Sequence, residues 1–333
     1  MMQAYAAEYI GCRGIPATRY EGACASASVA VRDAWMWVAS GAYDIVLAGG
    51  VERAATMGTG LATRTFAMFS DAHYEYPAGV TFPAVFAMLT HLYADTYNVP
   101  LDKLREQMAK VSIQSYRHGA VNPRAQFFGK NAAMTVEKVL GSFVVSTPLT
   151  LHDCCPFSDG AAAVILASEE AAKKLTDKPV YIIGAGQASN GPLVNQRDLP
   201  RIRARELSSQ QAYRMAGITP ADVDLCELHD CFSPASLIAA EGLGFFDFGT
   251  AGDAWDKGLA DIGGTVAINP SGGLKAKGHP IGATGAGQVF EVVSQLRGTV
   301  EPERQVPDAR IGMTDTLGGD GGTLVNMIFE KGW

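Results

Sequence analysis

Two residues far apart in the sequence, Cys24 and His279, have the side-chain types of a nucleophile and its base. Cys24 lies in the segment 21–26 (Glu-Gly-Ala-Cys-Ala-Ser), and His279 lies in the glycine-rich run 269–285. A thiol has a pKa of about 8.5, so a catalytic cysteine needs a helix N-terminus or a nearby imidazole to form its thiolate. Without the other segments, Cys24 is better interpreted as a small buried hydrophobic residue.

The hydrophobic spacing predicts a helix directly after each of these residues. Apolar side chains recur every three or four positions, which is typical of a buried helix, and Gly41 stands where the first helix should stop. The apolar positions are Val31, Ala34, Trp35 and Val38 after Cys24, and Ala286, Val289, Phe290 and Val293 after His279. We therefore expect two helix starts that face one pocket.

Two further segments carry groups that catalysis uses. His229 and Cys231 directly follow a short alternating run, 222–228, which predicts a strand. On an extended end both side chains point to the same side. A lone histidine or cysteine there would more often be structural. Near the C-terminus, the glycines of 318–322 let backbone N–H groups approach a substrate oxygen closely. A simple hairpin turn explains those glycines equally well.

With these four segments in this order, the chain resembles the thiolase superfamily from about residue 10 to its C-terminus. Within it, the chain is most similar to the sterol-carrier-protein-2 type and to archaeal and bacterial acetyl-CoA acetyltransferase-like thiolases. The resemblance implies that Cys24 is the nucleophile and His279 its base. It also implies that His229 and His279 stabilise an enolate oxygen, while the backbone N–H groups of Cys24 and Gly318 hold the oxygen of the acyl-enzyme.

The chain departs from many thiolases at two positions. They have an asparagine where this chain has His229, and a catalytic cysteine in the terminal turn, where this chain has Thr316. The subfamily that the chain resembles uses the cysteine of its His-Asp-Cys-Phe motif as the acid/base instead. The resemblance therefore assigns that role to Cys231.

The fold class implied is α/β: a thiolase-like fold of two similar halves packed as αβαβα layers, with a loop insertion in the first half. From the sequence pattern we expect halves at 1–175 and 176–333, a mostly parallel sheet in each, and a long irregular insertion at 53–145 that caps the site. The second half has a strand and helix well before its catalytic turn, whereas few residues precede Cys24. The first half is therefore expected to lack its first strand, helix and second strand.

Composition excludes several classes of protein. The chain has 333 residues, with 27 Lys and Arg against 34 Asp and Glu, and no basic block, which argues against a nucleic-acid partner. Its six cysteines are scattered without a metal-binding pattern, so we expect a reduced cytoplasmic protein with no metal site. The sequence contains no apolar run that predicts a membrane span or a signal peptide.

The function implied by the resemblance is thiolytic cleavage, or the reverse Claisen condensation, of a 3-oxoacyl-CoA through an acyl group on Cys24. Coenzyme A is a co-substrate and no cofactor is bound. Its pantetheine arm is expected to pass Cys155 and Pro156, although that turn equally well serves only to connect two strands. The partners implied are a second copy of the chain, in a homodimer or larger assembly, and an OB-fold protein with a zinc ribbon. A carbon–carbon lyase (aldolase) on the same scaffold and a non-catalytic subunit are the alternatives.

Overall fold

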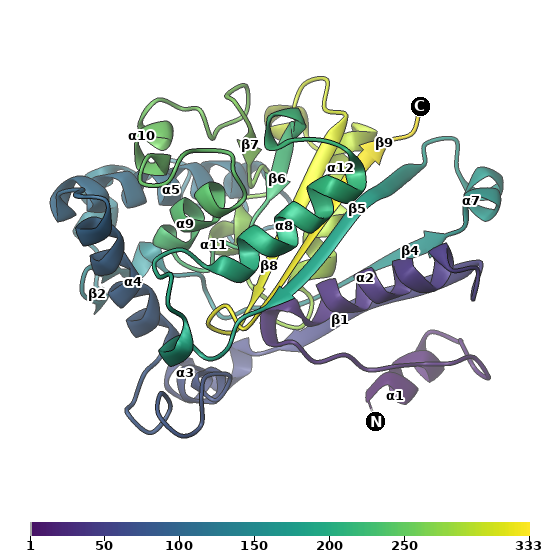
Figure 1. Cartoon of the computed structure of the whole chain (residues 1–333), viewed down its shortest axis with the longest axis horizontal. Coiled ribbons are helices and arrows are strands. Elements are labelled where there is room, and N and C mark those ends of the chain that lie inside the picture. Colours follow the sequence, from purple (N-terminus) through teal and green to yellow (C-terminus); the bar gives the residue numbers. More distant parts are fainter. Residues whose placement is uncertain (1) are drawn as a thin grey trace.

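The computed structural model describes residues 2–333, in which helices and strands alternate along most of the chain (Figure 1). The helices are α1 (Met2–Tyr9), α2 (Ser26–Ala39), α3 (Thr59–Ala67), α4 (Phe82–Thr96), α5 (Leu101–Val121), α6 (Val136–Leu140), α7 (Glu169–Leu175), α8 (Arg203–Ala216), α9 (Ser233–Gly242), α10 (Ala251–Asp256), α11 (Gly273–Ala276) and α12 (Thr284–Arg297). The strands are β1 (Ile45–Arg53), β2 (Val144–Ser146), β3 (Leu149–Thr150), β4 (Asp159–Ala167), β5 (Val180–Ser189), β6 (Leu225–Glu227), β7 (Ala267–Ile268), β8 (Ile311–Gly318) and β9 (Thr323–Lys331). The helices predicted after Cys24 and His279 are confirmed as α2 and α12.

The expectation of mostly parallel sheets is wrong. The larger sheet has the order β5-β9-β8-β6-β7, and only the pairs that β6 makes with β7 and β8 are parallel. The second sheet is the antiparallel pair β1 and β4, and β2 and β3 form a small antiparallel pair. The cause lies in the connections: β8 and β9 are joined by the tight glycine turn, and a short turn can only join antiparallel neighbours.

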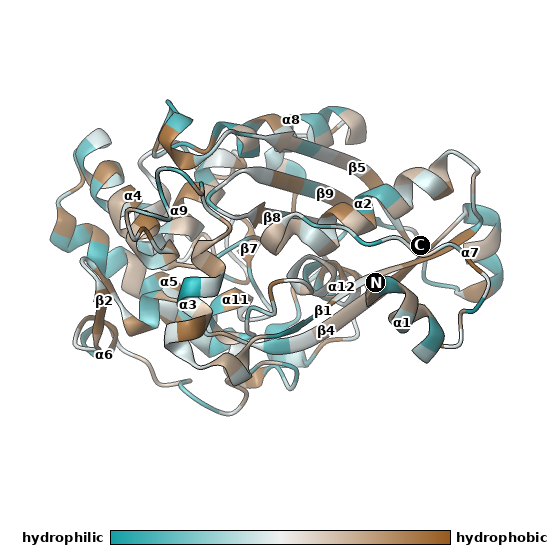
Figure 2. Ribbon diagram, turned by 90° about the horizontal axis from the view of Figure 1, so that it is seen from below, coloured by the Kyte–Doolittle hydropathy of each residue, from teal (hydrophilic) through white to brown (hydrophobic). Residues whose placement is uncertain are grey.

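The secondary structure stacks in layers (Figure 2). Helix α8 covers the outer face of the larger sheet on β5 and β9. Helices α2 and α12 contact strands of both sheets and lie between them. The pair β1 and β4 follows, and its outward face leaves Leu47, Val51 and Ile165 exposed. The two helices predicted to follow Cys24 and His279 therefore form the layer shared by both sheets.

The insertion, 53–145, is largely helical and not irregular as expected. It contains α3, α4, α5 and α6, and the 21-residue α5 is the longest helix in the described part of the chain. The buried residues Leu104, Met108 and Val111 of α5 recur at helical spacing and join the largest hydrophobic core together with residues of α4 and α9. This spacing is typical of a helix that buries one face against its neighbours.

Helices α2 and α12 approach closely at their N-terminal ends. A Cβ atom on Gly285 would overlap the Oγ and backbone nitrogen of Ser28, so only glycine fits at this crossing. Small residues thus bring the two helix starts together, as expected. Among residues 2–333, no helix combines the length and the apolar character needed to cross a bilayer.

Candidate active site

Cys24 lies on a tight turn that leads into α2. It sits in the 3-10 turn Ala23–Ala25, and Ala23 before it has φ +50°, a left-handed conformation that is rare for alanine. The turn is held by Glu21, whose Oε1 accepts the backbone N–H of Ala23 at 2.8 Å. Ser26 also holds it: its Oγ accepts the N–H of Gly22 at 3.0 Å and donates to the carbonyl of Ala23 at 2.6 Å. A strained, well-anchored turn therefore presents the thiol.

His279 lies between α11 and α12, and its orientation is set by two hydroxyl groups. Its backbone N–H donates to Ser158 Oγ at 2.9 Å, and its Nδ1 lies 2.7 Å from Thr284 Oγ1. The Thr284 hydroxyl donates its only proton to the carbonyl of Pro280 at 3.1 Å. It must therefore accept from Nδ1–H, which leaves the lone pair of the imidazole on Nε2.

His229 follows β6 and is completely buried, yet neither of its ring nitrogens has a hydrogen-bond partner among residues 2–333. Its ring lies edge-to-face against that of His279, with 5.1 Å between centroids. Its backbone N–H donates to Asp315 Oδ2 at 3.3 Å. Buried nitrogens without partners are rare and indicate a position that a water molecule or a ligand oxygen fills.

These segments bring three reactive groups to one point. The sulfur of Cys24 and one ring nitrogen each of His229 and His279 lie within 4.8 Å of one another, and all three side chains are buried. The sequence segments that carry them are more than 200 residues apart, at 21–26 and at 229–279. The structure thus places the predicted nucleophile beside both predicted histidines.

Two hydrogen-bonded links attach the 228–232 segment to the run that contains His279. The N–H of Leu228 donates to Asn269 Oδ1 at 2.8 Å, and the N–H of Leu274 donates to Asp230 Oδ1 at 2.7 Å. The neighbouring Glu227 carboxylate accepts from both the N–H and the hydroxyl of Ser271. All of these groups are buried, so the relative position of the two motifs is strongly held.

Cys231 and Cys155 lie side by side next to the cluster. The N–H of Cys155 donates to the carbonyl of Cys231 at 2.9 Å, beside an antiparallel bridge between Cys154 and Phe232. Pro156 continues this turn toward Phe157, which pairs with His279. All six cysteines of the chain are free thiols. The predicted acid/base residue and the predicted substrate-binding turn therefore meet.

The terminal glycine turn packs directly on the cysteine turn. A Cβ atom on Gly318 would overlap the carbonyl oxygen of Gly22, so this contact requires glycine. The next residue, Gly319, directs its backbone N–H to the sulfur of Cys24. The hydroxyl of Thr316 accepts a hydrogen bond from Ser28 Oγ and donates one to Gln288 Oε1. Gly318 and Gly319 both border the site, and both belong to the β8–β9 hairpin.

Burial keeps the reactive groups neutral. It raises the pKa of Cys24 to about 12, although hydrogen bonds from the N–H groups of Gly319 and of Cys24 itself act to lower this pKa. Burial lowers the pKa of His229 to about 3, with a further contribution from Arg205. It lowers the pKa of His279 as well, well below the usual range. The site without substrate therefore holds a thiol and two neutral imidazoles.

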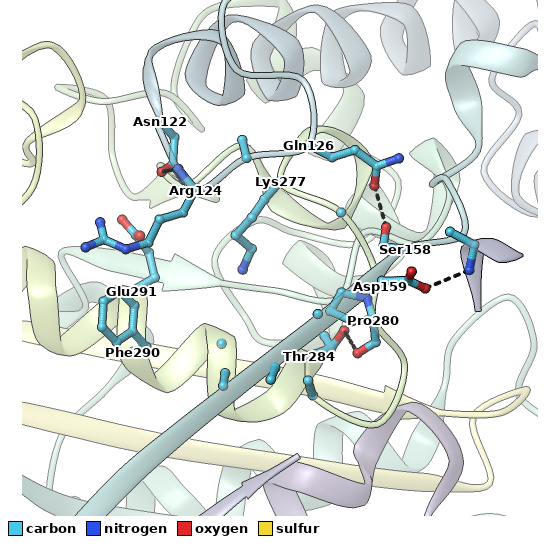
Figure 3. Close-up of a pocket in the computed structure, with 18 of the residues that line it drawn as sticks. Asn122, Arg124, Gln126, Ser158, Asp159, Lys277, Pro280, Thr284, Phe290 and Glu291 are labelled. Atoms are coloured by element: carbon cyan, nitrogen blue, oxygen red, sulfur yellow. Dashed lines mark hydrogen bonds between the residues drawn. The ribbon is translucent and has the colours of Figure 1, made fainter. Parts of the chain in front are cut away.

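A cavity of about 610 Å³ is lined in part by the glycine-rich run 269–285 and is shown in Figure 3. Its walls include Arg124 and Lys277, with the guanidinium of Arg124 5.1 Å from the ring centroid of Phe290. Cys24 and His229 are not among its lining residues. Thr284 connects the two regions, since it lines the cavity and orients His279.

Comparison with known proteins identifies the family of this chain. The family model described as "Thiolase, N-terminal domain" matches residues 1–148, and the one described as "Thiolase C-terminal domain-like" matches residues 185–331. The chain is 46% identical over 326 residues to an acetyl-CoA acetyltransferase of Methanothermobacter thermautotrophicus, covering 98% of this chain and 82% of that protein. The chain belongs to the thiolase family. The predicted resemblance and thiolase-like fold are thereby confirmed.

Two other relatives extend the comparison. Sterol carrier protein 2 of Homo sapiens is 33% identical over 337 residues, which are 97% of this thiolase-family chain and 60% of that protein. A solved structure described as "Ltp2-ChsH2(DUF35) aldolase" superposes with a TM-score of 0.81 at 27% identity, covering 99% of this chain and 84% of that one. The acetyltransferase relatives and the thiolase domains support an acyltransferase over the lyase and the non-catalytic alternatives.

Several residues that shape this thiolase site were not predicted from the sequence. They hold or contact the predicted residues and do not carry the reacting atoms themselves. Asn269 and Asp230 link the motifs, and Thr284 and Ser158 orient His279. Asp315 contacts His229, and Gly319 contacts Cys24. Asn269, Asp230 and Gly319 lie inside the motifs already singled out, so their place in those motifs could have identified them. Ser158 and Asp315 are brought next to the two histidines only by the tertiary structure.

Proposed function

We propose that this protein is a thiolase that cleaves a 3-oxoacyl-CoA with coenzyme A, or runs the reverse Claisen condensation, through an acyl group on Cys24. The observation that carries the proposal is the buried cluster of a thiol and two neutral imidazoles, within 4.8 Å of one another, at the start of α2. A neutral imidazole is the form that can accept a proton from the thiol.

The reaction begins with proton transfer from Cys24 to Nε2 of His279, whose Nδ1 is held by Thr284. The thiolate attacks the 3-keto carbon, the C2–C3 bond breaks, and the electron pair of that bond passes to the enolate of acetyl-CoA. Cys231 donates a proton to C2 of the enolate. Coenzyme A then gives its thiol proton to the Cys231 thiolate and attacks the acyl group. Cys24 leaves as a thiolate and regains its proton from His279, which completes a ping-pong cycle.

Negative charge develops on two oxygens, and the site has donors for both. His229 has two ring nitrogens without partners among the described residues, and together with His279 it stabilises the enolate oxygen, directly or through a water molecule. The backbone N–H groups of Cys24 and of the terminal turn at Gly318 and Gly319 stabilise the oxygen on the acylated carbon. Loss of one such donor costs about 10²–10³ in rate, which is the expected effect of His229→Ala.

The substrate arm and the partners are parts of the same proposal. The pantetheine arm of coenzyme A passes the turn at Cys155 and Pro156, which adjoins Cys231. Two copies of the chain associate in solution, and a protein of the OB-fold and zinc-ribbon type binds the assembly. The solved aldolase supports such a partner, because its name pairs Ltp2 with a second protein, ChsH2(DUF35).

Acyl-enzyme formation tests the proposal. Wild-type protein incubated with a 3-oxoacyl-CoA should carry an acyl group on the Cys24 peptide by mass analysis, and Cys24→Ser should lose several orders of magnitude in rate. Cys12→Ser, which alters a cysteine outside the cluster, is the matched control and should behave as wild type. An active Cys24→Ala protein without any adduct would favour the lyase.

A further inference from the structure

The three groups that converge at the start of α2 also form a set of metal ligands. Cys24, His229 and His279 each offer one donor atom, and these atoms lie within 4.8 Å of one another. Zn²⁺ prefers thiolate sulfur and imidazole nitrogen, and open zinc sites combine three such ligands with a fourth position for water. The donor set is uncharged apart from the thiolate that metal binding would create.

The distances require a small adjustment that the site can make. In a tetrahedral site with bonds of about 2.0–2.3 Å, neighbouring donor atoms lie about 3.5 Å apart, so the cluster must close by about 1 Å. This adjustment breaks no hydrogen bond of the His229 ring, because its nitrogens have no partner within residues 2–333.

His279 is already oriented as a metal ligand would be. Its Nδ1 is held by Thr284 Oγ1 at 2.7 Å, which leaves Nε2 with its lone pair toward the cluster. Histidines that bind metals usually have their other nitrogen held by such a hydrogen bond, which fixes the tautomer and the ring plane.

Charged groups of both signs act on the cluster. Glu21 and Glu52 act electrostatically on Cys24, while the cations Arg205 and Lys277 act on the two histidines. The thiolate formed on binding neutralises one of the two charges of a divalent ion. The site thus offers a soft donor set of one thiolate and two imidazoles.

We propose that Cys24, His229 and His279 reversibly bind one borderline divalent ion, Zn²⁺ or Co²⁺, and that the bound ion inhibits the enzyme. On binding, the hydrated ion exchanges water ligands for one sulfur and two nitrogens, and the thiol proton passes to solvent. Inhibition rests on the proposed function, because the ion occupies the electron pairs that the nucleophile and its base use. Binding itself does not depend on that function.

Cobalt is the probe that reports both binding and ligand type. The untagged full chain is titrated with Co²⁺ and followed by the absorption of cobalt–thiolate charge transfer. We expect one equivalent to bind with this band, and we expect Cys24→Ser to lose the band while the control Cys12→Ser keeps it. Wild-type protein alkylated with iodoacetamide at Cys24 should also lose the band, which makes the test independent of the folding of a variant.

Affinity and activity complete the test. His229→Ala should weaken Co²⁺ binding by about 100-fold or more, since even outer partners of metal ligands are worth about 10–100-fold. Zn²⁺ should inhibit the reaction and a chelator should reverse the inhibition, whereas Mg²⁺, which prefers oxygen ligands, should have no effect.

The possible failures overturn different parts of the proposal. Equal Co²⁺ binding by wild-type and Cys24→Ser proteins, or no bound ion at micromolar Co²⁺, would refute the site. Binding through Cys24 without any loss of activity would refute inhibition, and with it the proposed role of Cys24 as nucleophile. Absence of an acyl adduct on metal-free protein would refute the proposed function and leave the metal site standing.

Discussion

At the scale of single residues, the chemistry depends on a competition between burial and hydrogen bonding around one thiol. Burial raises the pKa of Cys24 to about 12, more than the N–H groups of Gly319 and Cys24 lower it. His279 stays neutral at physiological pH because burial lowers its pKa. In the proposed reaction the thiolate therefore forms by transfer of its proton to the imidazole and is not stored beforehand.

The first prediction concerns the reactivity of this thiol. Because the pKa of Cys24 is far above neutral, its thiolate fraction should rise about tenfold per pH unit between pH 7 and pH 9. Alkylation of the Cys24 peptide by iodoacetamide, measured by mass analysis, should follow this slope without a plateau. A plateau below pH 8 would show that a stored ion pair with an imidazole exists.

The second prediction separates the two thiols that are proposed to act in catalysis. Cys231→Ala should block exchange of the α-protons of acetyl-CoA with deuterated solvent, because no other thiol is proposed to protonate C2. Slow acylation of Cys24 should continue. Cys226→Ala alters a buried free cysteine in the preceding strand and should leave exchange intact. Exchange at the wild-type rate in Cys231→Ala would assign the proton transfer to another group.

At the scale of elements, the site depends on how closely α2 and α12 cross. Ser28 and Gly285 lie in contact there, and the hydroxyl of Ser28 donates a hydrogen bond to Thr316 Oγ1 in β8 at 2.6 Å. Thr316 in turn donates to Gln288 of α12 at 2.5 Å. The position that holds a catalytic cysteine in many thiolases thus serves here as part of a polar link between two helices and a strand.

The third prediction tests this crossing. Gly285→Ala should destabilise the protein by about 1–3 kcal/mol, because the added methyl group overlaps Ser28 and overpacks the contact. Gly287 lies on the same helix, and a Cβ atom there would be 3.9 Å from its nearest neighbouring atoms. Gly287→Ala should therefore be neutral or stabilising by up to about 1 kcal/mol. Urea unfolding of both variants gives the comparison, and equal stability would show that the helices can separate without cost.

At the scale of the whole molecule, a pair of carboxyl groups joins the insertion to the terminal turn. Glu75 accepts the N–H of Val194 at 2.9 Å, and Asp320 accepts the N–H of Leu193 at 2.9 Å. Both carboxyl groups are buried. Burial, together with Glu75, raises the pKa of Asp320 to about 6. Three segments distant in sequence therefore meet next to the glycine turn that borders Cys24.

The fourth prediction follows from the sign of this shift. A carboxyl group whose pKa is raised on folding stabilises the fold in its protonated form. This contribution is fully present below the unfolded pKa of about 3.9 and is lost as pH rises through about 6. The melting temperature of wild type relative to Asp320→Asn should thus fall between pH 4.5 and pH 7.5. A constant difference over that range would exclude a titrating Asp320.

The sequence by itself determined the local features of this protein. The positions of α2 and α12 followed from hydrophobic spacing, and Cys24, His229, Cys231 and His279 were recognisable because their motifs occur in the order typical of a family. The helices of the insertion were missed, since a helix such as α5 is stabilised by packing on α9 and α10, and propensity alone is a weak signal there.

Only the tertiary structure decided the properties that depend on distance and burial. The pairing of β5 with β9, the contact of Ser28 with Gly285 and the links from Asn269 and Asp230 join segments that no local pattern connects. The neutral state of the cluster is also a tertiary property, because a pKa responds to the loss of water around a group and not to its neighbours in sequence. Spacing can name a thiol and two imidazoles, but only packing brings them within 4.8 Å and removes the solvent between them.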